Sequence, residues 1–176
     1  MLGAAGALCC LAAGTAIGSW MGERRMARWR MISAYADALG GMRLLLEQER
    51  PALPELLSDC AGYISHGSGA EEAAKRLRLT AQLLEQQPLL QVSDAYASAC
   101  AKVYAPWEKP EEYAAMEMLF RQLGLGTAAM REQAAAACIR RLRPLAEDAR
   151  KEAEKGGKLC MQLGILLGLM AGIALW

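Results

Sequence analysis

All charged side chains of this chain lie between residues 23 and 158, so both ends are uncharged. A helix rises about 1.5 Å per residue and a hydrocarbon core is roughly 30 Å thick, so residues 1–22 are long enough to cross a bilayer. The last apolar stretch is near the short limit for a span. The pattern predicts a transmembrane helix over 1–22, a cytosolic helical domain over 23–157 and a second transmembrane helix over 158–176.

Glycine recurs at every fourth position in both uncharged ends. The positions are Gly14, Gly18, Gly22, Gly164, Gly168 and Gly172. Small residues at this spacing let transmembrane helices approach closely, although glycine is also simply tolerated in lipid. Because two ladders share one spacing, we interpret them as helix-packing positions, used either within the chain or between subunits.

The first apolar stretch has two alternative interpretations as a cleaved segment. A secretory signal peptide has a basic region before its apolar run, whereas here no Lys or Arg precedes the run and Glu23-Arg24-Arg25 follows it. A lipoprotein signal at Cys9 or Cys10 needs a small residue before the modified cysteine, and Leu8 and Cys9 stand there. A retained helix is the favoured interpretation.

Basic residues flank the predicted spans on the side of the central domain. They are Arg24, Arg25, Arg28, Arg30, Lys151, Lys155 and Lys158. Positive charge stays on the cytoplasmic side of a membrane. We therefore expect the domain in the cytosol and both termini on the opposite side of the membrane.

Composition argues against nucleic acid and against metal or cofactor chemistry. The chain has 20 Lys and Arg against 19 Asp and Glu, which is no surplus for binding a polyanion. Its six cysteines are dispersed without a CxxC motif, and a cytosolic domain keeps them reduced. The lone His66 has no ligand partners at metal spacing and is interpreted as a loop residue. We expect no cofactor and no metal.

The central domain is predicted to be all-α, a six-helix bundle between the two spans. Ala, Leu, Glu, Gln and Arg abound, and no alternating strand pattern occurs. Apolar stripes at helical spacing predict a first helix continuous with the N-terminal span, followed by helices over about 56–64, 68–87, 92–104, 110–123 and 127–155. Ser68 with Glu71 resembles a capping box, and Thr127 can cap the last helix. We expect Met130 in the core and the Gly156-Gly157 pair as a break before the second span.

The domain contains no motif of a known catalytic site. It has no nucleophile elbow, no HExxH, no P-loop and no glycine-rich dinucleotide turn. The glutamate pairs 47/49 and 111/112 could serve as acid and base, but such pairs usually lie on a solvated face or complement a helix dipole. Arg140, Arg141 and Arg143 are either a contact surface for an acidic lipid or protein, or ordinary solubilising charges.

The order of these features resembles the stage III sporulation protein AB family of endospore-forming bacteria. The resemblance rests on the uncharged first span, the basic entry, the amphipathic helix over 34–47 before Pro51, the run Phe120-Arg121-Gln122-Leu123-Gly124 and the run Leu163-Gly164-Ile165-Leu166-Leu167-Gly168-Leu169. Similar proteins often have an acidic residue where this chain has Thr127. Because of this difference, Thr127 joins Arg140, Arg141 and Arg143 as a candidate partner contact.

The resemblance implies a non-enzymatic part in the channel apparatus between mother cell and forespore, in the mother-cell membrane surrounding the forespore. The family's soluble domain is similar to the cytoplasmic domains of type II secretion and type IV pilus platform proteins. The implied partners are a secretion ATPase like stage III sporulation protein AA and the channel's other membrane subunits. Three alternatives stay open: a membrane scaffold without ATPase contact, a membrane-anchored enzyme using scattered acids, and a small pore-forming protein.

Overall fold

The computed structural model describes residues 2–48, 51–64 and 67–174, and every regular element in this part of the chain is a helix. Side chains of most residues before Gly18 and after Gly156 lie outside the description. The helices are α1 (Leu2–Gln48), α2 (Leu53–Gly62), α3 (Ala70–Gln86), α4 (Val92–Lys102), α5 (Pro110–Leu123) and α6 (Ala128–Ala174). The predicted all-α class is confirmed, and the expected loop at His66 lies outside the described residues.

The described chain forms six helices, and both end segments are continuous with bundle helices. The continuity of the first apolar stretch with its neighbour is confirmed in α1. The predicted break at Gly156-Gly157 is wrong, since α6 runs through both glycines and also through Pro144. A glycine inside a helix costs only about 1 kcal/mol. A Cβ at Gly156 would overlap the Arg25 guanidinium, so this glycine makes room for a side chain instead of ending the helix.

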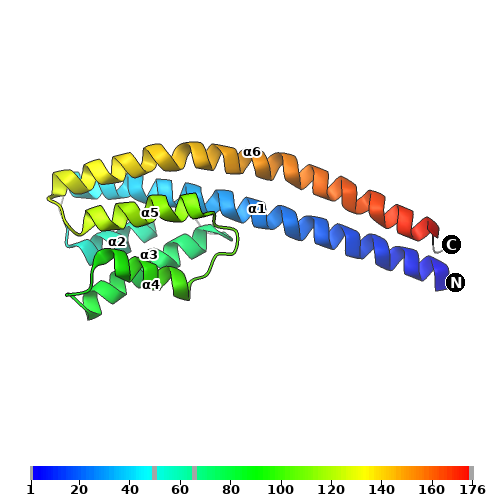
Figure 1. The fold of residues 1–176 in the computed structure, drawn as a ribbon, viewed down its shortest axis with the longest axis horizontal. Helices are drawn as coiled ribbons and strands as arrows, with labels where there is room; N and C mark the ends of the chain where they lie inside the picture. The colour runs from blue at the N-terminus through cyan, green and yellow to red at the C-terminus, as the bar shows by residue number, and fades with distance from the viewer. Residues whose placement is uncertain (1, 49–50, 65–66, 175–176) are drawn as a thin grey trace. The chain divides into compact units, whose positions relative to one another are not determined.

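The chain divides into two compact units. One consists of residues 27–147, here called the bundle, and the other of residues 1–26 with 148–176, here called the helix pair. The domain boundaries at residues 22 and 157 stay predictions. In the bundle, α2 packs against α3, α3 against α4 and α4 against α5. Figure 1 shows α5 between α4 and the bundle part of α6.

The core of the bundle is built from the apolar stripes that the sequence predicts. The buried residues of α1 include Ile32, Tyr35, Leu39, Met42 and Leu46. At the centre, Tyr96 of α4 stacks on Phe120 of α5 with 4.1 Å between ring centroids. The Tyr96 hydroxyl donates a 3.3 Å hydrogen bond to the hydroxyl of Tyr35. Helices distant in the chain therefore meet around one aromatic cluster.

Two buried ion pairs join elements far apart in the chain, and the sequence patterns missed both. Arg28 of α1 lies 2.6 Å from a carboxylate oxygen of Glu112 on α5, with both side chains buried. Arg28 is therefore not the free surface charge expected of a membrane flank. Arg76 of α3 donates through Nη1 to both oxygens of Glu108 at 2.9 Å and through Nε to the Val103 carbonyl at 2.9 Å.

The start of α3 differs from the predicted capping box. The backbone N–H of Gly69, not of Ser68, donates to the carboxylate of Glu72 at 2.7 Å. Gly69 has φ +90°, and a Cβ there would overlap the carbonyl oxygen of Ala27 on α1. Only glycine fits this turn, which holds α3 against α1.

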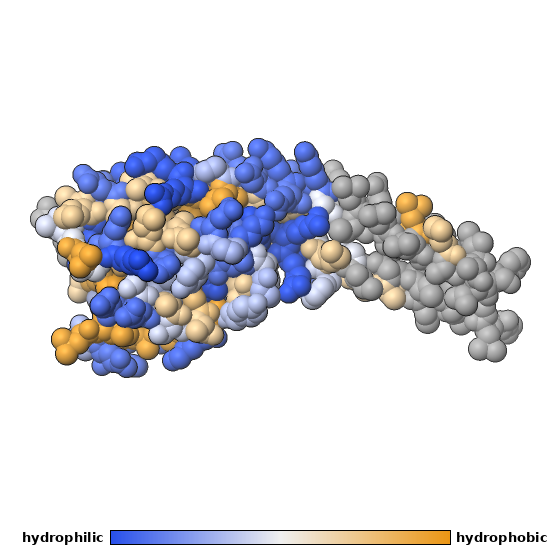
Figure 2. All heavy atoms as spheres, in the orientation of Figure 1, coloured by the Kyte–Doolittle hydropathy of each residue, from blue (hydrophilic) through white to orange (hydrophobic). Residues whose placement is uncertain are grey.

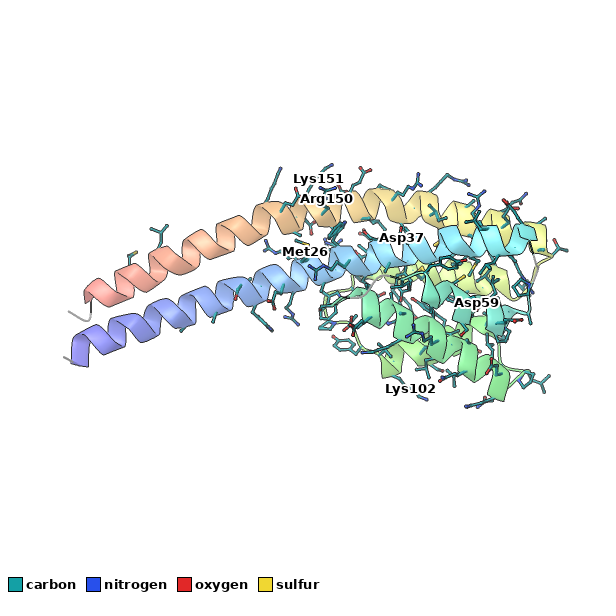
Figure 3. All side chains as sticks on the ribbon, turned by 180° about the vertical axis from the view of Figure 1, so that it is seen from behind. Met26, Asp37, Asp59, Lys102, Arg150 and Lys151 are labelled. Carbon is teal, nitrogen blue, oxygen red and sulfur yellow. The ribbon has the colours of Figure 1, made fainter. Side chains whose placement is uncertain are left out.

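Charged residues of the bundle such as Asp59 and Lys102 lie on the outer surface of the bundle (Figure 3).

Candidate functional site

The predicted contact residues lie on the exposed surface of the bundle, but not all together. Arg140, Arg141 and Arg143 are exposed on α6, and Thr127 is exposed just before its first residue. The Thr127 carbonyl accepts the N–H of Arg131 at 3.0 Å, the first bond of that helix, as expected of a cap residue. The structure brings Arg140 and Arg141 into one surface depression, whereas Thr127 and Arg143 do not line it.

A shallow groove follows the outer side of the contact between α5 and α6, and we call it the α5–α6 groove. It consists of two hollows of about 570 and 440 Å³, joined by a narrow stretch of about 50 Å³. Alanines form much of its lining, namely Ala114, Ala115, Ala134, Ala136 and Ala137. Small side chains on both helices keep the groove open to the approach of another element.

Methionines and arginines line the groove above these alanines. Met118 of α5 is 44% exposed and Met130 of α6 is 57% exposed. The prediction of Met130 in the core is therefore wrong. Met130 lines the larger of the two hollows, and no residue of the described chain covers it there. Arg141 crosses the narrow stretch, and its Nη1 donates to the Met118 sulfur at 2.9 Å. A thioether is a weak acceptor, so this contact holds Arg141 only weakly.

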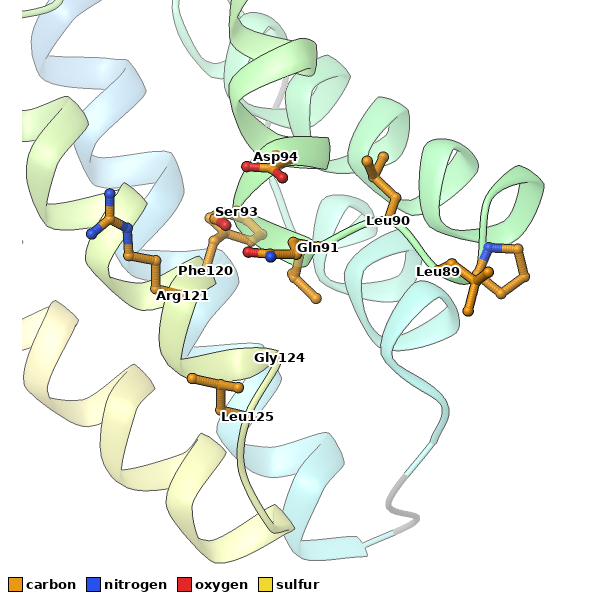
Figure 4. Close-up of a pocket in the computed structure, with 11 residues that line it drawn as sticks. Leu89, Leu90, Gln91, Ser93, Asp94, Phe120, Arg121, Gly124 and Leu125 are labelled. Atoms are coloured by element: carbon orange, nitrogen blue, oxygen red, sulfur yellow. The ribbon is translucent and has the colours of Figure 1, made fainter.

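A separate hollow, of about 690 Å³, lies between the α3–α4 turn and the end of α5 (Figure 4). Leu89 in that turn is fully exposed, and Leu125 in the α5–α6 turn is 88% exposed. Leu125 lines both this hollow and the α5–α6 groove. Figure 2 shows apolar side chains at the surface over both turns. Exposed apolar groups gathered at one end of a domain are typical of interaction surfaces.

The helix pair contains the glycine ladders, of which the structure describes a part. Gly18 is buried and Gly22 is half-buried, while the packing of Gly14, Gly164, Gly168 and Gly172 lies outside the described side chains. A search of the described residues finds no helix with the length and apolar character that a membrane crossing needs.

Aromatic and apolar side chains face outwards from the helix pair. Trp20 is 54% exposed and carries the Arg24 guanidinium 4.4 Å from its ring centroid, a cation–π contact. Leu166 and Met170 are 57% and 68% exposed. The outer surface of this unit is therefore apolar at several described positions, and one tryptophan there is paired with a basic residue.

The glutamates considered for acid–base chemistry do not form a paired acid and base in the described part of the chain. Glu112 is buried in its pair with Arg28, whereas Glu111 and Glu47 are exposed, and Glu49 lies outside the described residues.

Burial raises the pKa of the Cys60 and Cys138 thiols to about 12, which keeps both protonated and weakly nucleophilic at neutral pH. Among the described residues no three His, Cys, Asp or Glu side chains gather as a metal site.

The fold and the surface together define an all-α helical bundle with open apolar hollows between its helices. The family described as stage III sporulation protein AB matches residues 3–176, and the chain belongs to this family. Membership implies a role in sporulation. A comparison with curated proteins gives no match.

One solved structure, named stage III sporulation protein AB, has a similar fold. It matches with a TM-score of 0.59 and 16% sequence identity, over 72% of this chain and 96% of the other. At this identity the likeness concerns the fold alone.

Proposed function

We propose that this protein is a non-enzymatic membrane platform of a sporulation channel between mother cell and forespore. In this role it docks a cytosolic secretion ATPase of the stage III sporulation protein AA type and couples it to other membrane subunits. One observation carries the proposal: the two helices that bear the uncharged ends, α1 and α6, are each continuous into the bundle. Force on the bundle can therefore be transmitted to both ends of the chain through unbroken helices.

The membrane part of the proposal is supported by charge and by composition. Both uncharged ends lack every Lys, Arg, Asp and Glu, and basic residues flank them on the side of the bundle. By the positive-inside rule the bundle lies in the cytosol and both termini on the other side. We place the protein in the mother-cell membrane that surrounds the forespore, in keeping with its family.

A scaffold without ATPase contact is the second candidate. The outward-facing Trp20, Met21, Leu166 and Met170 of the helix pair favour it, because they offer apolar surface to lipid or to neighbouring subunits. A scaffold would act through this surface alone. It predicts that the bundle has no specific soluble partner.

Binding to the ATPase separates the two candidates. The full chain, in nanodiscs of neutral lipid, is titrated with a secretion ATPase of the stage III sporulation protein AA type, with and without ATP. We expect saturable binding, and we expect Arg141→Glu to weaken it about tenfold because a charge at an interface rim is reversed. The matched control Lys102→Glu, on α4, should leave the affinity unchanged. Absence of binding in both nucleotide states, with both proteins folded, would favour the scaffold.

A further inference from the structure

The α5–α6 groove is an apolar depression with a basic edge, and nothing in the described chain occupies it. We propose that this groove binds an amphipathic helix of a partner protein, with apolar side chains against the alanines and methionines and acidic side chains toward Arg140 and Arg141. The inference goes beyond the proposed function, since it holds whichever protein carries the helix.

The dimensions of the groove suit a helix of about four turns. Its lining extends along α6 from Met130 to Leu145, and at 1.5 Å per residue this is about 22 Å. Two hollows separated by a narrow stretch can each take one large apolar side chain, as grooves do that bind helical ligands. Methionines adapt their shape to such ligands, and Met118 and Met130 contribute one to each hollow.

The groove favours a helix over an extended peptide because both of its walls are helices. Their backbone N–H and C=O groups are used inside α5 and α6, so the walls present side chains only. An extended peptide would bury its own backbone groups without partners there, at a cost comparable to lost hydrogen bonds. A helix satisfies its backbone internally and presents only side chains to the groove.

The charges at the groove favour an acidic ligand. Arg140 and Arg141 line it, Arg143 lies nearby on the same helix, and none of the three forms an ion pair with a carboxylate in the described part of the chain. By contrast, the neighbouring Arg121 is paired with Glu117 at 2.7 Å. Glu111 is the one acidic residue of the lining. Arg141 can exchange its weak thioether acceptor for a carboxylate, which forms a stronger, charge-assisted bond.

A protein helix fits these observations better than the headgroup of an acidic lipid. A headgroup would use the arginines but would leave both apolar hollows and the exposed methionines empty. The combination of apolar lining and basic edge therefore points to a ligand with both characters on one face.

The test uses two synthetic helices as probes. Each has roughly 18 residues with leucine at positions i, i+3, i+4 and i+7, flanked by glutamate in one and by lysine in the other. Binding to the full chain in neutral-lipid nanodiscs is followed by fluorescence anisotropy. We expect saturable binding of the glutamate helix, at least about tenfold tighter than the lysine helix, and weaker at high salt.

Two variants connect this binding to the groove. Ala137→Leu fills the floor and should weaken binding about tenfold, whereas Ala97→Leu, on an exposed position of α4, should not change it. The double variant Arg140→Glu, Arg141→Glu should remove the preference for the glutamate helix without touching the core, which keeps the test decisive if Ala137→Leu folds poorly. Equal binding of both helices, no effect of either groove variant, or displacement of the helix by phosphatidylserine in the nanodisc would overturn the inference.

Discussion

Arg76 is the most completely buried of the charged side chains described in the bundle, with 1% of its surface exposed. Its burial is compensated by three hydrogen bonds: Nη1 donates to both carboxylate oxygens of Glu108, and Nε donates to the Val103 carbonyl. A buried charge without such partners would cost several kcal/mol. The pair therefore determines how the α4–α5 connection lies against α3.

Glu108→Ala should lower the free energy of unfolding by about 3 kcal/mol, because it leaves the Arg76 charge buried without its carboxylate. The double variant Arg76→Met, Glu108→Ala should recover most of that loss, since a buried pair can be replaced by apolar groups. Urea unfolding of the full chain in mild detergent, followed by circular dichroism, measures both.

The exposed pair between Arg121 and Glu117 is the control for this experiment. Glu117→Ala removes an i,i+4 pair on the surface of α5 and should cost less than about 0.5 kcal/mol. Similar losses for Glu108→Ala and Glu117→Ala would show that the buried pair contributes no more than a surface one.

At the scale of elements, the turn before α3 is held against α1 by a glycine. Gly69→Ala should lower the free energy of unfolding by about 3 kcal/mol or more, because φ is positive there and the new Cβ would overlap the Ala27 carbonyl. Gly67→Ala is the matched control: its φ is also positive, but nothing lies within 4 Å of the added Cβ, so about 1 kcal/mol is expected. Thermal unfolding of both variants gives the comparison, and equal shifts would refute the role of the close approach.

The helices could be predicted from the sequence because apolar periodicity and breakers are local signals. The α1 stripe from Ile32 to Leu46 is buried as predicted, and α5 begins at Pro110 as predicted. The break at Gly156-Gly157 was wrong because two glycines reduce helix stability without preventing a helix. A local signal cannot say whether the rest of the structure compensates for such a cost.

The candidate site was predictable only in part. The arginine cluster on α6 is visible in the sequence, and Arg140 and Arg141 are exposed as a contact surface requires. The groove itself was not predictable, because it depends on Met118 of α5 lying opposite Ala137 of α6. Periodicity assigns a residue to a helix face but does not say which neighbour covers that face, which is why Met130 was placed in the core.

At the scale of the whole molecule, the bundle core contains several groups that folding keeps protonated. Burial raises the pKa of the Cys60 and Cys138 thiols to about 12, above the ordinary value of 9.0, and raises the pKa of the Tyr35 and Tyr96 hydroxyls as well. Between pH 9 and 12 the unfolded chain releases thiol protons that the folded chain retains. The unfolded state then binds fewer protons, so stability falls as pH rises.

The melting temperature of the full chain should therefore be nearly constant between pH 7 and 8.5 and fall steadily above pH 9. Each thiol should contribute about 1 kcal/mol of lost stability by pH 10. Cys138→Ala should lower the melting temperature at neutral pH but make its fall with pH less steep. A melting temperature that is constant to pH 11, or that falls equally steeply in the variant, would contradict this account.

Two ion pairs join α1 to residues far along the chain, the buried pair of Arg28 with Glu112 and a half-buried pair of Arg43 with Glu132 at 3.2 Å, and their sequence separation sets the order in which the fold can be completed during synthesis. Glu112 follows its partner Arg28 by 84 positions along the chain, and Glu132 follows its partner Arg43 by 89. At about 5 to 20 residues per second, a ribosome needs several seconds to add that much polypeptide. For that time the first helix has emerged without two of its eventual neighbours, so the bundle can close only when α5 and the start of α6 have left the exit tunnel.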